Sequence, residues 1–193
     1  MGLPANFGRL GRLRDLRLEL FHLASLPRSI TGLRRLRSLH IDSHHLCGLP
    51  EGLRALQELR ALSLLLRRVI VPDWQHRGHF RARFEQRLEA LFAILAELPG
   101  LTSLTLGEPP PDGWCPDPIV DRLPAELAGL RALERLSFVD LHGAIALPHS
   151  VVMPALREIS VEWATLEATE HELETMFPGA RISRSIPWSA SPE

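Results

Sequence analysis

Histidine and cysteine are the first candidates for chemistry in this sequence, because both side chains bind metal ions and act as bases or nucleophiles. His76 and His79 lie three residues apart, without cysteine or carboxylate nearby at the spacing of metal ligands. His44 and His45 precede Cys47, and we interpret these three as turn and core residues. We therefore predict no metal site.

Motifs typical of enzymes are missing. The sequence contains no glycine-rich phosphate loop, no nucleophile elbow and no HExxH motif. Serine, histidine and aspartate are scattered along the chain, and residues scattered in this way do not by themselves predict a catalytic triad. We predict a non-catalytic protein that needs no cofactor, and we keep an enzyme as a remote alternative.

A repeat of 23 residues organises the chain. Leu-Pro pairs recur at Leu3-Pro4, Leu26-Pro27, Leu49-Pro50, Leu123-Pro124 and Leu147-Pro148. Between them L-x-x-L-x-L occurs six times, at Leu13-Leu16-Leu18, Leu36-Leu39-Ile41, Leu59-Leu62-Leu64, Leu101-Leu104-Leu106, Leu133-Leu136-Phe138 and Leu156-Ile159-Val161. The L-x-L part has the spacing of a strand with one buried face, and the part before it has the three-residue spacing of a helical turn. One unit cannot bury its own leucines, so we expect the units to stack.

The pattern L-P-x-x-L-x-x-L-x-x-L-x-L, clearest between Leu26-Pro27 and Leu46, resembles the leucine-rich-repeat family of intracellular scaffolds and bacterial effectors. The resemblance covers residues 3 to about 183. It implies an α/β solenoid with a parallel concave sheet of six to seven short strands, helical or 3₁₀ convex segments and two insertions. Phe177 and the segment 181–183 would supply the last strand. We predict a single such domain over residues 1–185, followed by a tail over 186–193.

The turns after the strands depart from the family pattern. The family usually carries asparagine three residues after the last strand leucine, where it ties down the turn backbone, and here those positions are Phe21, His44, Arg67, Pro109, Leu141 and Ala164. The turn backbone must therefore find other partners.

Cys115-Pro-Asp117 resembles the Cys-x-Asp of bacterial ubiquitin ligases with such repeats, but their separate catalytic domain is absent, so we treat the match as chance.

The two insertions interrupt the middle of the array. An apolar stripe that runs from Phe80 to Leu98 predicts an amphipathic helix within about residues 73–98, either an elongated convex helix or a partner-binding helix. A proline-rich loop is expected over residues 108–122. Its Trp114 is either an exposed contact anchor or a cover for the irregular repeat.

Function should lie on the concave face, where the residues between the strand leucines point outward. Leu65 and Val139 are apolar where polar residues are expected, and an apolar patch flanked by charge is typical of a protein-binding surface. The alternative is that an insertion folds over Leu65. The predicted partner-binding residues are Arg17, Glu19, His40, Asp42, Leu65, Thr105, Trp114, Arg135, Val139, Glu158, Glu162 and Trp163.

Arginines also form a row beside this face. Arg14, Arg37 and Arg60 occupy the same position in three successive repeats, so they should stack about 5 Å apart and repel one another. We favour relief by Asp15 and Glu58 within the chain over relief by an acidic partner or an anion.

Charge is unevenly distributed along the chain. Residues 1–100 carry 16 arginines and 9 acidic residues, a net charge of +7, whereas residues 101–193 carry 6 and 14, a net charge of −8. This split predicts weak head-to-tail self-association at low salt.

All 22 basic residues are arginine, which is typical of a GC-rich bacterial genome. A protein delivered into a host cell would also gain from offering no lysine to ubiquitin.

Several function classes are unfavoured. No apolar stretch is long enough to cross a membrane, arginines occupy the place of a signal-peptide core, and two cysteines make no disulfide framework. Few aromatic residues accompany the arginines, so we predict no nucleic-acid binding. We predict a bacterial, cytoplasmic module that binds a protein partner, and the alternative is the recognition domain of an effector secreted into a host cell without a cleaved signal peptide.

Overall fold

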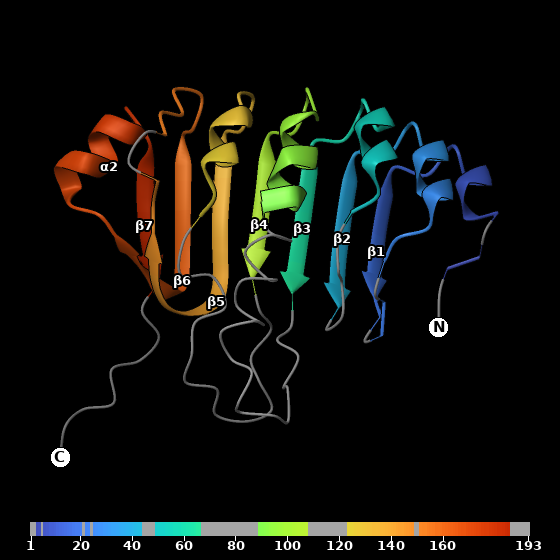
Figure 1. The fold of residues 1–193 in the computed structure, drawn as a ribbon, viewed down its shortest axis with the longest axis horizontal. Helices are drawn as coiled ribbons and strands as arrows, with labels where there is room; N and C mark the ends of the chain where they lie inside the picture. Colours follow the sequence, from blue (N-terminus) through green and yellow to red (C-terminus); the bar gives the residue numbers. More distant parts are fainter. Residues whose placement is uncertain are drawn as a thin grey trace, which may run out of the picture.

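The sheet is the largest element of the computed structural model. The structure describes residues 3–4, 6–20, 22–23, 25–43, 49–66, 89–107, 123–148 and 151–185. Within these ranges seven parallel strands lie side by side in chain order (Figure 1). The strands are β1 (Asp15–Glu19), β2 (Ser38–Ser43), β3 (Ala61–Leu66), β4 (Ser103–Gly107), β5 (Arg135–Ala146), β6 (Glu158–Glu167) and β7 (Arg181–Ser185). The predicted parallel sheet of six to seven strands is confirmed, and β7 contains the predicted segment 181–183, whereas Phe177 lies outside the strand.

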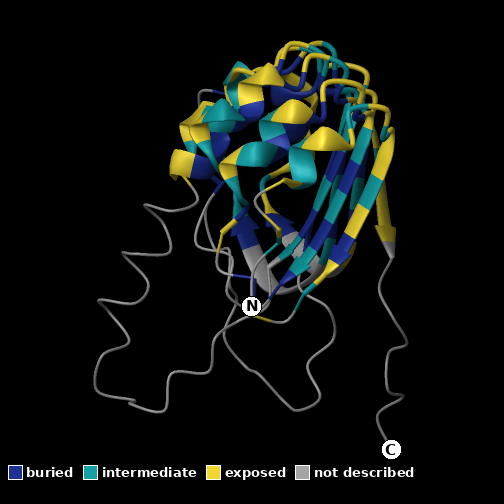
Figure 2. Cartoon of the chain, turned by 90° about the vertical axis from the view of Figure 1, so that its right-hand side faces the viewer, coloured by how far each residue is buried: buried dark blue, intermediate teal, exposed yellow. Residues whose placement is uncertain are grey.

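Short helices form a second layer on one side of the sheet (Figure 2). Four are 3₁₀ helices: η1 (Phe7–Arg9), η2 (Arg28–Gly32), η3 (Glu51–Ala55) and η5 (Ala125–Gly129). The Leu-Pro pairs explain where η2, η3 and η5 begin. Pro27, Pro50 and Pro124 stand directly before them with φ of −67°, −68° and −73°, the value that the proline ring imposes and that suits the entry to a helical turn.

Leucines of the repeat meet between the two layers. The register places Leu39, Leu62 and Leu104 opposite one another on neighbouring strands, and all three are buried. The leucines before each strand and those of the 3₁₀ helices join the same continuous core. Each repeat contacts only its neighbours. Burial of apolar surface between neighbouring repeats is therefore the main force that holds the stack together.

Groups other than asparagine bind the backbone of the turns. The hydroxyl of Ser43, which is buried, donates to the carbonyl of Leu23 in the preceding turn at 2.7 Å. Farther along, β5 and β6 continue past their turns and pair again from Gly143 with Ala164 to Ala146 with Glu167, after a register shift. A serine hydroxyl and an extended backbone ladder therefore bind turn groups in this chain, which has no asparagine at these positions.

The chain is also helical over residues 89–96, within the first predicted insertion. Leu91, Leu95 and Leu98 are buried as the apolar stripe predicted, and Phe92 is buried with them. The rest of the predicted helix and the proline-rich loop at 108–122 lie outside the described residues. A second helix, α2 (Glu170–Met176), was not predicted and packs Leu173 and Met176 into the core.

Candidate partner-binding face

The face of the sheet opposite the helical layer carries three columns of side chains, which the strand register defines. We call it the open face. The first column is Asp15, Ser38, Ala61, Ser103, Arg135 and Glu158; the middle column is Arg17, His40, Ser63, Thr105, Ser137 and Ser160; the last column is Glu19, Asp42, Leu65, Gly107, Val139 and Glu162.

An apolar patch lies in the last column. Gly107 stands between Leu65 and Val139, and a Cβ atom on this glycine would lie 3.1 Å from Leu65 Cδ2, 3.1 Å from Val139 Cβ and 2.4 Å from the Val139 carbonyl oxygen. Only glycine fits this space, so the side chains from β3 and β5 close over β4. We call Leu65, Gly107 and Val139 the Leu65–Val139 patch. Both apolar side chains are half-buried.

A polar cluster occupies the first strands of the same face. His40 Nδ1 lies 3.0 Å from the hydroxyl of Ser63, and Arg17 forms an exposed ion pair with Glu19. Burial lowers the pKa of His40 below its usual 6.5, and the neighbouring charge of Arg17 lowers this pKa further, while Asp42 and Glu19 act in the opposite direction. The neutral imidazole is therefore favoured.

This cluster does not have the geometry of a catalytic triad. A serine nucleophile needs an imidazole whose second nitrogen is held by a carboxylate. His40 Nε2 is buried and has no hydrogen-bond partner among the described residues, while Nδ1 is engaged by Ser63. His40 and Ser63 thus position each other across β2 and β3, and the pair lacks the third member of a proton relay.

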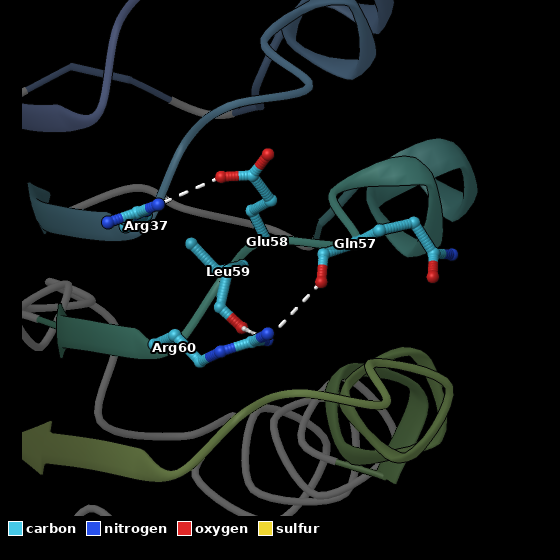
Figure 3. Close-up of polar contacts among 5 residues, drawn as sticks. All are labelled: Arg37, Gln57, Glu58, Leu59 and Arg60. Carbon is cyan, nitrogen blue, oxygen red and sulfur yellow. Dashed lines mark hydrogen bonds and ion pairs between the residues drawn. The ribbon is translucent and has the colours of Figure 1, made fainter.

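The arginine row is relieved within the chain at two of its three members, Arg37 and Arg60. Arg37 Nε lies 3.4 Å from Glu58 Oε2, and Arg60 turns back to donate from Nη1 to the carbonyls of Gln57 at 3.2 Å and Leu59 at 3.4 Å (Figure 3). Arg37, Glu58 and Arg60 line a hollow of about 310 Å³. The carboxylate in this hollow neutralises one of the two guanidinium groups, as we expected for Glu58. The expected relief of Arg14 by Asp15 is not seen, because no ion pair joins these two described residues.

Comparisons with known proteins bear on the fold. No protein-family model matches the sequence, and no curated protein matches it. A leucine-rich-repeat protein of Leptospira interrogans aligns with a TM-score of 0.54 and 21% sequence identity, over 94% of this chain and 39% of the Leptospira protein. This chain has the leucine-rich-repeat fold. Human trophoblast glycoprotein, also described as Wnt-activated inhibitory factor 1, aligns with a TM-score of 0.46 and 19% identity, over 96% of this chain and 74% of the human protein.

The leucine-rich-repeat sheet spreads the predicted site residues over three regions. Arg17, Glu19, His40 and Asp42 lie in the polar cluster on β1 and β2. Leu65 and Val139 meet in the patch, and half-buried Thr105 lies beside it on β4. Arg135, Glu158 and Glu162 are exposed on β5 and β6. Trp114 and the side chain of Trp163 lie outside the described residues.

Two contributors were not singled out from the sequence. Gly107 and Ser63 are small residues in the outward columns, and their roles depend on neighbours from other repeats. A glycine inside a strand pattern is the signal that could have found the first, because it indicates close approach of another group. Periodicity alone carries no signal for the second.

Metal and membrane sites were sought among the described residues. No group of three or more histidine, cysteine or acidic side chains is placed there to hold a metal ion. None of the described helices is long and apolar enough to cross a membrane.

Proposed function

We propose that this solenoid is a non-catalytic protein-interaction module that binds a protein partner through the open face of its sheet. The observation that carries the proposal is the closure of Leu65 and Val139 over Gly107, which makes a contiguous apolar surface on an otherwise polar face. Apolar surface with a charged surround is typical of the centre of a protein interface.

The surroundings of the patch support this role. Asp42 on β2 and Glu162 on β6 flank it in the same column, and serine and threonine fill the middle column beside it. Small side chains let a partner approach the sheet closely, and the flanking carboxylates favour a partner with basic residues around an apolar centre. β3 ends at Leu66 and β4 ends at Gly107, so both strands end at the patch.

We place this module in a bacterial cytoplasm. The alternative, a recognition domain delivered into a host cell, is favoured by one observation, the presence of arginine and no lysine among 22 basic residues. Loss of lysine removes every side-chain acceptor for ubiquitin. The chain spans 39% of the Leptospira protein, so the proposal includes no activity of longer proteins with this fold.

Quantitative affinity capture tests the open face. The bait is the full chain, and the comparison is between wild type and the double variant Leu65→Asp plus Val139→Asp. Buried unpaired carboxylates at the centre of an interface should reduce captured partner by about tenfold or more. Val152→Asp is the matched control, because Val152 is an exposed apolar residue, 53% accessible, between β5 and β6.

The variants must keep their fold for the comparison to count, and circular dichroism with a thermal melt checks this. A partner captured equally by wild type, the control and the double variant contradicts the proposal. Loss of capture in both variants also contradicts it, because the effect would then not depend on the patch.

A further inference from the structure

The first repeat exposes apolar positions that every other repeat buries. Leu10 is 52% accessible, whereas the equivalent Leu33, Leu56 and Leu130 are at most 4% accessible. Leu10 and Val152 are the exposed large hydrophobic residues among the described part of the chain. Among the described residues, no apolar group covers Leu10 as the preceding repeat covers Leu33, Leu56 and Leu130.

Other residues of the first repeat share this exposure. Leu13 and Leu16 are half-buried, although their counterparts on β2 and before it, Leu36 and Leu39, are buried. Leu3 and Phe7 are half-buried in the same way. Together Leu3, Phe7, Leu10, Leu13 and Leu16 form what we call the N-terminal end face, toward which Figure 2 looks along the solenoid.

The edge of β1 offers backbone groups at this same end. Ser38 N donates to Arg14 O, and Leu20 N donates to Asp42 O, so the even-numbered residues direct their peptide groups toward β2. The alternate residues Asp15, Arg17 and Glu19 therefore direct theirs away from the sheet. An open strand edge of this kind is a template for pairing with another strand.

The opposite end of the solenoid is closed. Helix α2 and the turn after it bury Leu173, Met176 and Phe177 against the last repeat. On β7 the inward position opposite Val161 is Arg184, which is exposed. A charge at an inward position of an edge strand discourages further strand pairing. As far as residue 185, where the described part ends, the C-terminal end is thus a polar cap that offers the N-terminal end face little apolar surface.

We propose that the N-terminal end face binds the same face of a second copy of this chain, in a closed twofold dimer with the two β1 strands antiparallel. A register centred on Leu18 places Arg17 of one copy opposite Glu19 of the other, and Leu16 opposite Leu20. Because the dimer is twofold symmetric, the opposite-charge pair and the leucine pair each occur twice. The outward peptide groups of Arg17 in one copy then hydrogen-bond to those of Glu19 in the other.

The alternative is the head-to-tail association that the charge split predicts. That arrangement joins a basic end to an acidic end without closing, so it should grow with concentration and weaken as salt screens the charges. The twofold dimer rests mainly on apolar burial and brings two basic N-terminal halves together, so salt should not weaken it, and it stops at two copies. Concentration and salt therefore separate the two arrangements.

Sedimentation equilibrium of the full chain over a concentration series, at low and high salt, tests the proposal. We expect wild type to saturate at a dimer whose dissociation constant changes little with salt. Leu10→Asp should weaken dimerisation by about tenfold or more, because it buries an unpaired carboxylate. Val152→Asp, equally exposed but remote from the end face, should dimerise like wild type.

Three results would overturn the proposal: a monomer at every concentration, open-ended growth that salt suppresses, or a dimer that Leu10→Asp leaves unchanged. Leu10 is largely exposed, so this variant should fold, and circular dichroism verifies it. The end face and the Leu65–Val139 patch share no residue, so this experiment and the capture experiment fail independently.

Discussion

His40 illustrates how neighbours from other strands determine the behaviour of a single side chain. Its ring is half-buried, contacts the Ser63 hydroxyl at 3.0 Å and lies close to Arg17. Burial and the positive charge both favour the neutral imidazole and so lower the pKa of His40 in the folded chain. An unfolded chain offers neither, so it binds the proton more readily.

The free energy of unfolding should therefore depend on pH through His40. As pH falls through the usual histidine value of 6.5, the unfolded state gains protons first, and stability falls until the pH is below the folded pKa. Urea denaturation from pH 7.5 to about 5 should show a smaller loss of stability for His40→Gln than for wild type. Parallel curves for the two proteins would show that His40 does not contribute.

Helix α2 shows how much local sequence can specify. Thr169 precedes the helix, and its hydroxyl accepts from Glu172 N at 3.3 Å while Glu172 Oε2 accepts from Thr169 N at 2.8 Å. This capping box is visible in the sequence as Thr-x-x-Glu, although the repeat pattern does not extend to it. The helix and the 3₁₀ turns after the Leu-Pro pairs therefore begin at residues that local chemistry selects.

Removal of the cap should destabilise the chain. Thr169→Ala leaves the amide of Glu172 without its acceptor, and it should lower the free energy of unfolding by about 1 kcal/mol. Thr175→Ala is the control, since Thr175 is exposed in the same helix and donates to the His171 carbonyl without capping. Urea denaturation measures both, and equal losses would argue against the capping role.

Burial changes along the solenoid although the repeat sequence hardly does. Leu16 and Leu104 occupy equivalent positions, on β1 and β4, yet Leu16 is half-buried and Leu104 is completely buried. In a stacked array a repeat is stabilised by both neighbours, and an end repeat has only one. The N-terminal repeat should therefore contribute less to overall stability.

Alanine substitution should reveal this gradient. Leu104→Ala should cost about 2–5 kcal/mol, because it opens a cavity in the middle of the core, whereas Leu16→Ala should cost clearly less. Denaturation must be measured at concentrations where the chain is monomeric, so that the end face stays uncovered. Losses of similar size would contradict the burial gradient.

Leucine and proline spacing is sufficient to predict the parallel sheet, the 3₁₀ turns after Leu-Pro and the outward columns, because these depend on contacts within a repeat or between adjacent, nearly identical repeats. Tertiary structure alone decides which outward residues act together. Leu65 and Val139 approach each other because β4 places Gly107 between them, and Leu10 is exposed whereas its equivalents in later repeats are buried. The leucine pattern does place Leu65 and Val139 among the outward residues. Their separation in the chain depends on the insertions, however, so the pattern does not show that the two side chains close over Gly107.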